Sequence, residues 1–327
     1  MSNSKWLKLT EILLNAYTPL ILWTGLGLLL FKFIPQNLPR LLGRGLYWLG
    51  VPLEILALAR RTKFSEGIAW STTVVLVSLM VSLTLAWLSL QLGKRLASDN
   101  SSYQHQLQKL SFQGSFILSA TLGNTGFIGL AIAPLLVNDQ ALNLVVFYSI
   151  SQNILGTYGI GVLVASYFGH SDQYHHWWVQ IRDVLSVPSL WAFIVGFFTR
   201  SVALPASIES GLQASVWIVI PCAFLLMGIR LGQIQGWKSF QMALLPSLLK
   251  VVILPIIVGF GTTLLGIPRT SQLALVLMSG MPTAFASLIL AEEYELERDT
   301  IASSIVLTST MLLLMIPLWL ALFGEPW

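Results

Sequence analysis

Four residues that disfavour an α-helix interrupt an uncharged segment, residues 111–136: Gly123, Asn124, Thr125 and Gly126. Inside a bilayer, such a break leaves backbone N–H and C=O groups that need partners. The half-helix that follows a break presents free N–H groups and partial positive charge, which together bind a carboxylate or phosphate. These four residues therefore predict non-helical backbone and an anion site, to which the Asn124 and Thr125 side chains add hydrogen bonds.

A second apolar segment, residues 271–292, is interrupted at its centre by Gly280, Met281, Pro282 and Thr283. Proline lacks a backbone N–H group and clashes with the preceding turn of a helix. Paired interruptions in two halves of a chain indicate a transporter binding site near the bilayer midplane. We therefore predict that the two segments cross, with these four residues outside helix and part of the substrate site, where the Thr283 side chain adds a hydrogen bond. The alternative is that both breaks are kinks at which small residues pack against neighbouring helices.

Four further polar residues lie within apolar segments: Tyr148, Gln152, Glu54 and Lys250. Tyr148 and Gln152 are four positions apart, so they share a helix face and either line the site or join neighbouring helices by hydrogen bonds. A charged carboxylate at mid-membrane costs about 2.5–3.5 kcal/mol on insertion scales. Glu54 is therefore a candidate to couple a proton or to pair with Lys250. Lys250 could instead neutralise a substrate anion or extend to the membrane interface.

The sequence offers no other pattern that carries chemistry. His175 and His176 are adjacent in a polar stretch, which is poor spacing for a metal site. There is no P-loop, nucleotide signature or Ser–His–Asp order. We therefore expect no cofactor, no metal and no enzymatic activity. An intramembrane enzyme is the alternative, as is a receptor or assembly protein that does not transport.

The elements that must position these residues are membrane helices. Of the 327 residues, 55% are hydrophobic and 10% charged, whereas soluble domains carry about 25% charged residues. The net charge of +4 suits loops beside anionic lipid better than nucleic acid. A spanning helix needs about 20 apolar residues. Ten predicted spans cover residues 11–34, 38–59, 67–91, 111–136, 141–168, 184–200, 206–231, 242–265, 271–292 and 299–323.

A shared spacing indicates an internal duplication of five helices. The pairs that lie 169 positions apart are Pro19 with Pro188, Gly27 with Gly196, and Pro52 with Pro221. Because five is odd, the second copy would enter the membrane from the opposite side, as in secondary transporters. The predicted division is a first repeat over residues 1–168, a connecting loop over 169–183 and an inverted repeat over 184–327. The alternative is coincidence, since Pro and Gly are common in membrane helices.

The distribution of charge predicts the location of the loops. More Lys and Arg residues lie in the loops opposite the N-terminus than on its own side, so the positive-inside rule puts both termini outside. We expect a multi-pass protein of the plasma or inner membrane. The acidic residues Glu292, Glu293, Glu295 and Glu297 are predicted to form a solvated helix end and loop.

Three motifs also resemble a known family. "GNTGFIGL", "GVPLEILALA" and "MPTAFASLILAEEYELERD" are similar to the auxin efflux carrier family, within the bile acid/arsenite/riboflavin-type transporter superfamily. This resemblance implies ten helices in two inverted repeats, with the fourth and ninth crossing. It also implies a scaffold of helices one, two, six and seven beside an elevator-like transport domain. Asn124 and Pro282 match the crossover positions. Ala131 stands where many relatives have proline, and the short central loop makes auxin itself a poor candidate.

Residues and resemblance together predict a secondary active transporter of a small organic anion, with a carboxylate as the leading candidate. We expect alternating access by an elevator mechanism. The expected partners are the substrate and the lipid bilayer, with proton or sodium coupling and a homodimer as open expectations.

Overall fold

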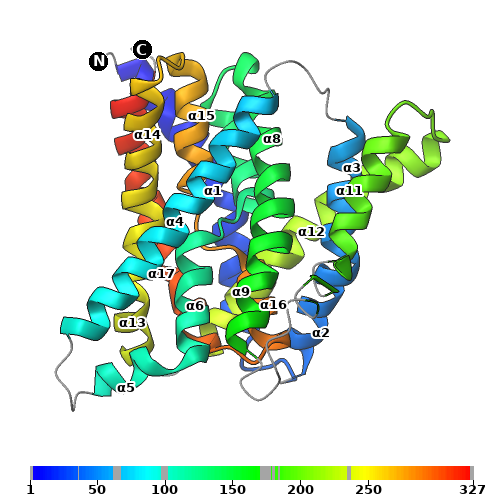
Figure 1. Ribbon diagram of the computed structural model, residues 1–327. Helices are drawn as coiled ribbons and strands as arrows, with labels where there is room; N and C mark the ends of the chain where they lie inside the picture. The colour runs from blue at the N-terminus through cyan, green and yellow to red at the C-terminus, as the bar shows by residue number, and fades with distance from the viewer. Residues whose placement is uncertain are drawn as a thin grey trace.

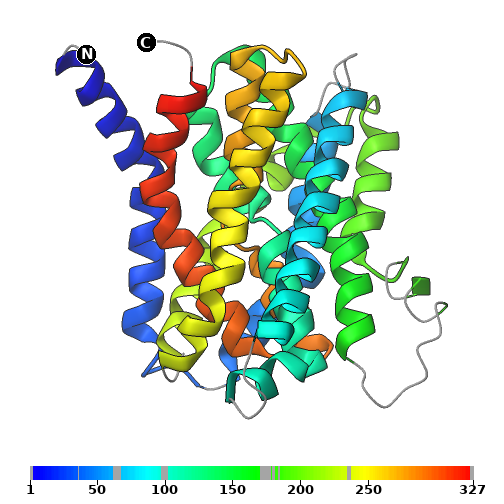
Figure 2. The ribbon, with the colours of Figure 1, turned by 60° about the vertical axis from the view of Figure 1, so that its left-hand side comes forward.

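A computed structural model describes residues 3–35, 37–61, 68–96, 102–169, 178, 181–182, 185–233 and 237–324. Most of the predicted connecting loop over 169–183, including His175 and His176, lies outside these residues. The described residues form helices and contain no strand; a single β-bridge joins two loops within the bundle. The two ends of the chain lie at the same end of the bundle (Figures 1 and 2).

The helices of the first half follow the predicted segments, with π-helical turns (η) inserted in several. They are α1 (Asn3–Leu30), α2 (Leu38–Gly45), η1 (Leu46–Gly50), α3 (Val51–Arg61), α4 (Ile68–Leu96), α5 (Ser102–Gln108), α6 (Leu110–Thr121), η2 (Thr125–Gly129), α7 (Leu130–Leu136), α8 (Asp139–Ser151), η3 (Gln152–Gly161) and α9 (Val162–Gly169). The short helix α5 was not predicted.

The second half shows the same alternation of long and interrupted helices. They are α11 (Pro188–Thr199), α12 (Ala206–Gln233), α13 (Trp237–Leu248), η4 (Leu249–Ile253), α14 (Leu254–Leu264), α15 (Arg269–Ser279), α16 (Phe285–Glu293) and α17 (Arg298–Phe323).

Among the described residues, four helices are long and apolar enough to cross a membrane: Thr72–Leu96, Ala206–Gln233, Ser239–Leu264 and Arg298–Phe323. Large apolar side chains also cover the outside of the bundle, where water would disfavour them but lipid would not. Examples are Leu29, Phe33, Trp217, Phe260 and Leu264. The expectation of a polytopic membrane protein is confirmed in this general form.

The helices pack as two groups. In the first, the α1/α12 group, α1 and α2 pack against α12, and α3 packs against α11 and α12. Figure 1 shows α3 and α11 side by side at one edge of the bundle. The second, the broken-helix group, contains α4, α6–α9 and α13–α17. Within it, α6 contacts α9, α4 and α17, while α15 contacts α14 and α8.

Glycines allow the close approach of helices within the α1/α12 group. A Cβ atom on Gly27 would overlap the carbonyl oxygen of Leu225 in α12. A Cβ atom on Gly196 in α11 would lie 3.0 Å from the carbonyl oxygen of Leu56 in α3. These two contacts are equivalent under the 169-residue spacing, which relates Gly27 to Gly196 and Leu56 to Leu225.

We predict that Gly27→Ala lowers the thermal stability of the protein in detergent, because overpacking a close helix contact costs about 1–3 kcal/mol. Gly25→Ala is the matched control on the same helix, since nothing lies within 4 Å of its added Cβ. The control should be neutral or stabilising, because alanine favours helix over glycine by about 1 kcal/mol. Equal melting temperatures for the two variants would contradict the close approach of α1 and α12.

Candidate functional site

The two interrupted segments meet at their breaks. Gly123 and Thr283 form an antiparallel β-bridge. The Asn124 N–H group donates to the Pro282 carbonyl at 2.7 Å, and the Ala284 N–H group donates to the Leu122 carbonyl at 2.9 Å. Each break thus supplies hydrogen-bond partners for backbone groups of the other. Lipid could not supply these partners.

The breaks lie at slightly different residues from those predicted. Non-helical backbone covers residues 122–124 and 280–284, whereas Thr125 and Gly126 already belong to the first turn of η2. The cause is Asn124, whose side chain accepts a hydrogen bond from the Phe127 N–H group at 3.2 Å and so caps η2. The mutual hydrogen bonds relate residues that are 160 positions apart in the chain, and they place Gly123 opposite Thr283.

The remaining crossover residues are held by neighbouring helices. The Thr283 hydroxyl donates to the Ser119 carbonyl at 2.9 Å, and its N–H group donates to the Thr308 hydroxyl at 3.1 Å. Gly280 lies against the Trp319 ring so closely that a side chain at this position would overlap it. Thr283, Gly280 and the fully buried Met281 therefore build the crossover itself.

Lys250 lies on one side of this crossover. Its ammonium group donates to the Ser279 carbonyl at 2.8 Å, at the C-terminal end of α15, and the side chain is 2% exposed. The Nζ atom would lie 3.0 Å from a Cβ atom on Gly123, just past the C-terminal end of α6. Because helix C-termini carry partial negative charge, the ammonium group compensates both ends. It does not extend to the membrane interface.

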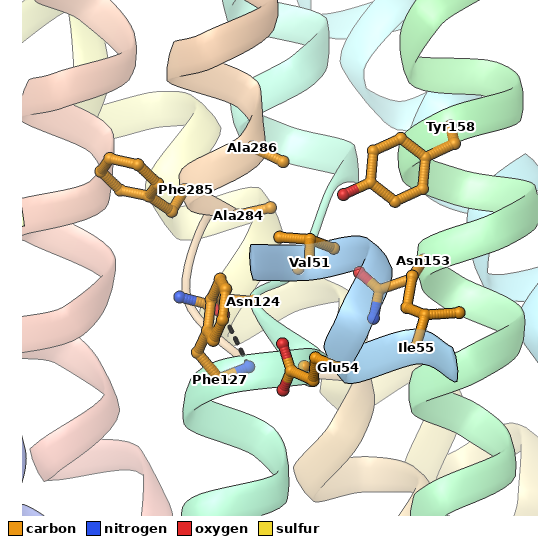
Figure 3. Close-up of a pocket in the computed structure, with 12 residues that line it drawn as sticks. Val51, Glu54, Ile55, Asn124, Phe127, Asn153, Tyr158, Ala284, Phe285 and Ala286 are labelled. Carbon is orange, nitrogen blue, oxygen red and sulfur yellow. Dashed lines mark hydrogen bonds between the residues drawn. The ribbon is translucent and has the colours of Figure 1, made fainter. Parts of the chain in front are cut away.

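A narrow cavity lies on another side of the crossover, at the boundary between the two helix groups (Figure 3). The space between its lining atoms totals about 390 Å³, counting its opening to solvent. Its walls are Val51, Glu54, Ile55, Gly123, Asn124, Gly126, Phe127, Asn153, Tyr158, Ala284, Phe285 and Ala286. The enclosed part of this space is about 20 Å³, enough for about one water molecule, so a larger solute requires the walls to move apart.

The N-terminal ends of two half-helices face this cavity. Asn124, Gly126 and Phe127 belong to the start of η2, while Ala284, Phe285 and Ala286 belong to the start of α16. N–H groups in the first turn of a helix have no carbonyl partner within it. Two such ends at one cavity produce the positive electrostatic potential that favours an anion.

The structure brings only part of the predicted site together. Gly123, Asn124 and Gly126 line the cavity, as does Glu54, whereas Thr125, Tyr148 and Gln152 are buried outside its lining.

Asn153 and Tyr158 line the cavity instead, and they were missed. The reason is η3, which begins at Gln152. A π-helical turn is wider than an α-helical turn, so the α-helical periodicity that assigned residues to one face fails there. Six residues in "QNILGTYGIG" are glycine or β-branched, but the spacing alone does not indicate a π-helix.

Glu54 and Lys250 do not form the ion pair that the sequence offered as one alternative. Glu54 is 3% exposed and lines the cavity from α3, with its Oε1 atom lacking a hydrogen-bond partner. Lys250 is bound at the crossover. In the view of Figure 3, the Glu54 carboxylate is drawn in the lower part of the cavity near Phe127, and Ala284 and Ala286 are drawn in the upper part. No Lys, Arg or His residue is among those that line the cavity in the described part of the chain.

Sequence comparisons bear on the class of protein. Residues 177–320 match the profile of a family described as membrane transport protein. The chain is 24% identical over 295 residues to an uncharacterized transporter of Methanocaldococcus jannaschii, covering 89% of this chain and 91% of the relative. It is also 24% identical over 203 residues to an uncharacterized transporter of Methanothermobacter thermautotrophicus, covering 62% of this chain and 65% of the relative.

These similarities confirm the predicted resemblance to a family of membrane transport proteins. The matched profile and both relatives are described as transport proteins, and the apolar helices of this chain are those of an integral membrane protein.

We predict that Asn124→Ala both weakens the cap of η2, by about 0.5–2 kcal/mol, and lowers transport. Asn138→Ala is the matched control, because the Asn138 side chain caps α8 through the Ala141 N–H group and lies away from the cavity. It should lose similar stability without losing transport. Asn124→Asp should keep the cap and still lower transport of an anion, because it adds like charge. Thermal unfolding and uptake into proteoliposomes measure both effects; equal transport by all three variants would contradict a role for Asn124 at the site.

Proposed function

We propose that the protein is a secondary active transporter of a small organic anion, with a carboxylate as the leading candidate. The observation that carries this proposal is the meeting of the N-terminal ends of η2 and α16 at one cavity within an apolar bundle. A carboxylate placed there accepts hydrogen bonds from first-turn N–H groups and from the Asn124 amide.

Two regularities support an arrangement of ten membrane crossings as two inverted repeats of five. The helix contacts at Gly27 and Gly196 are equivalent under the 169-residue spacing. The paired breaks are equivalent under the 160-residue spacing. This spacing relates Asn124 to Ala284 and Leu122 to Pro282, so each of the two mutual hydrogen bonds corresponds to the other. An even number of crossings also agrees with chain ends at one end of the bundle (Figure 2).

An elevator mechanism is supported by the position of the cavity between the two helix groups. Val51, Glu54 and Ile55 come from the α1/α12 group, and the other lining residues come from the broken-helix group. In this mechanism the broken-helix group carries the substrate past a stationary α1/α12 group. The contacts between the groups would then have to break in each transport cycle.

One such contact is the ion pair between Arg230 of α12 and Glu292 of α16, which also carries a hydrogen bond. Arg44 of α2 lies 3.9 Å from Glu293, but both side chains are exposed, so this second pair contributes little. Glu292 was predicted to be solvated; it is instead largely buried against Arg230. The Arg230–Glu292 pair thus joins the two groups in the conformation described here.

The direct test is uptake of radiolabelled short-chain carboxylates by the purified protein in sealed liposomes. We predict uptake that saturates with substrate concentration and that Asn124→Asp reduces. Cations and uncharged analogues of the same size should not compete. A protein that moves none of the carboxylates would contradict the proposed function, and would favour a receptor or assembly role.

A cross-link between the groups tests the elevator mechanism. In a Cys222→Ser background, which removes the single native cysteine, a cleavable bifunctional thiol reagent should join Arg230→Cys to Glu292→Cys and stop transport. Reduction should restore it. The matched control joins Arg60→Cys to Glu209→Cys, an ion pair of 3.6 Å within the α1/α12 group, and should leave transport intact. Full transport with the Arg230–Glu292 cross-link in place would rule out sliding of the two groups.

A further inference from the structure

Glu54 places a carboxylate in a cavity that the backbone makes favourable to anions. The side chain projects from α3 and is almost fully buried, and its Oε1 atom has no hydrogen-bond partner. A buried carboxylate without a partner is costly, because the protein interior cannot replace the water that it loses. Its place in the cavity wall therefore calls for a partner that arrives from outside.

The cavity offers that carboxylate no cation of its own. Among the described residues that line it, Glu54 and Tyr158 are the ones that can ionise, and neither is basic. Lys250 is occupied at the crossover by the Ser279 carbonyl. The neutral amide of Asn153 also lines the cavity, but an amide does not balance a charge.

The two walls of the cavity therefore favour opposite charges. On the broken-helix side, the N-terminal ends of η2 and α16 and the Asn124 amide favour a negative group. On the α1/α12 side, Glu54 favours a positive one. A simple anion that filled the cavity would have a carboxylate facing it, which disfavours both charges.

We propose that Glu54 selects a zwitterionic substrate, namely a small amino-carboxylate that places its carboxylate at the two half-helix ends and its ammonium group at Glu54. This inference rests on the proposed transport of carboxylates and specifies their class. The substrate supplies the cation that the cavity lacks. Glu54 is thus a specificity-determining residue on the group that stays in place.

The test compares matched substrates on the native chain. Purified protein in liposomes is offered three sets of compounds with three to five carbons: amino acids with the amine at the α or the terminal carbon, diacids, and unsubstituted monoacids. At least one amino-carboxylate should be taken up about 10- to 150-fold better than the diacid and monoacid of equal carbon number, which is the size of one charge-assisted hydrogen bond. Stabilisation of the protein against heat by the same compounds should follow the same order.

Glu54→Gln removes the charge and keeps the shape of the side chain. The preference for the amino-carboxylate over the monoacid should collapse toward unity in this variant. Glu209→Gln is the matched control, because it removes a carboxylate of the same helix group that lies outside the cavity wall. It should keep the native preference. Should Glu54→Gln fail to fold, Glu54→Asp and the native ranking of substrates decide the matter.

Three results would be decisive. A native preference for the diacid or monoacid, with uptake that rises as the pH falls and no longer does so in Glu54→Gln, would overturn the proposal and make the carboxyl group a proton carrier. An amino-carboxylate preference that survives Glu54→Gln would also overturn it. Failure to transport any of the three sets would instead contradict the proposed function itself.

Discussion

The mutual hydrogen bonding of two interrupted backbones is the constraint on which the rest of this structure depends. A chain that breaks its helices in an apolar bundle must find partners for the freed groups, at a cost of several kcal/mol, roughly, for each one left unpaired. Here each break contributes one N–H group and one carbonyl to the other, through Asn124 with Pro282 and Ala284 with Leu122. Neither break would be stable alone in an apolar bundle. The mutual hydrogen bonds therefore join the two halves of the chain at their breaks.

That pairing also places the negative and the positive helix ends on different sides of the crossover. The C-terminal end of α15 and the chain just past α6 contact the Lys250 side chain, whereas the N-terminal ends of η2 and α16 face the cavity. Because the ammonium group compensates the negative ends, the positive ends keep their full effect on the cavity. Lys250 thus lies at the negative helix ends and not among the residues that line the cavity. On the proposed function, the two positive helix ends take the place of a basic side chain in the cavity wall.

The sequence predicted the membrane class, the helical segments and the two breaks, because Gly, Pro and long apolar runs act locally. It failed where the outcome depends on contacts between distant segments. Asn124 shortened the first break by capping η2, and the backbone pairing set the spacing of the breaks at 160. Asn153 and Tyr158, both in the π-helix η3, line the cavity, whereas Tyr148 of α8 and Gln152 do not. The separation of Glu54 from Lys250 likewise follows from tertiary packing, since the sequence allowed them to pair.

The backbone of the site is nearly symmetric, but its side chains are not. Under the 160-residue spacing Asn124 corresponds to Ala284, and under the 169-residue spacing Glu54 corresponds to Ala223. Duplication can supply paired breaks and paired helix ends, since these depend on main-chain geometry. It cannot by itself tell one end of a ligand from the other. The amide and the carboxyl group each occur in one half alone, so the orientation of a bound molecule must come from these unduplicated side chains.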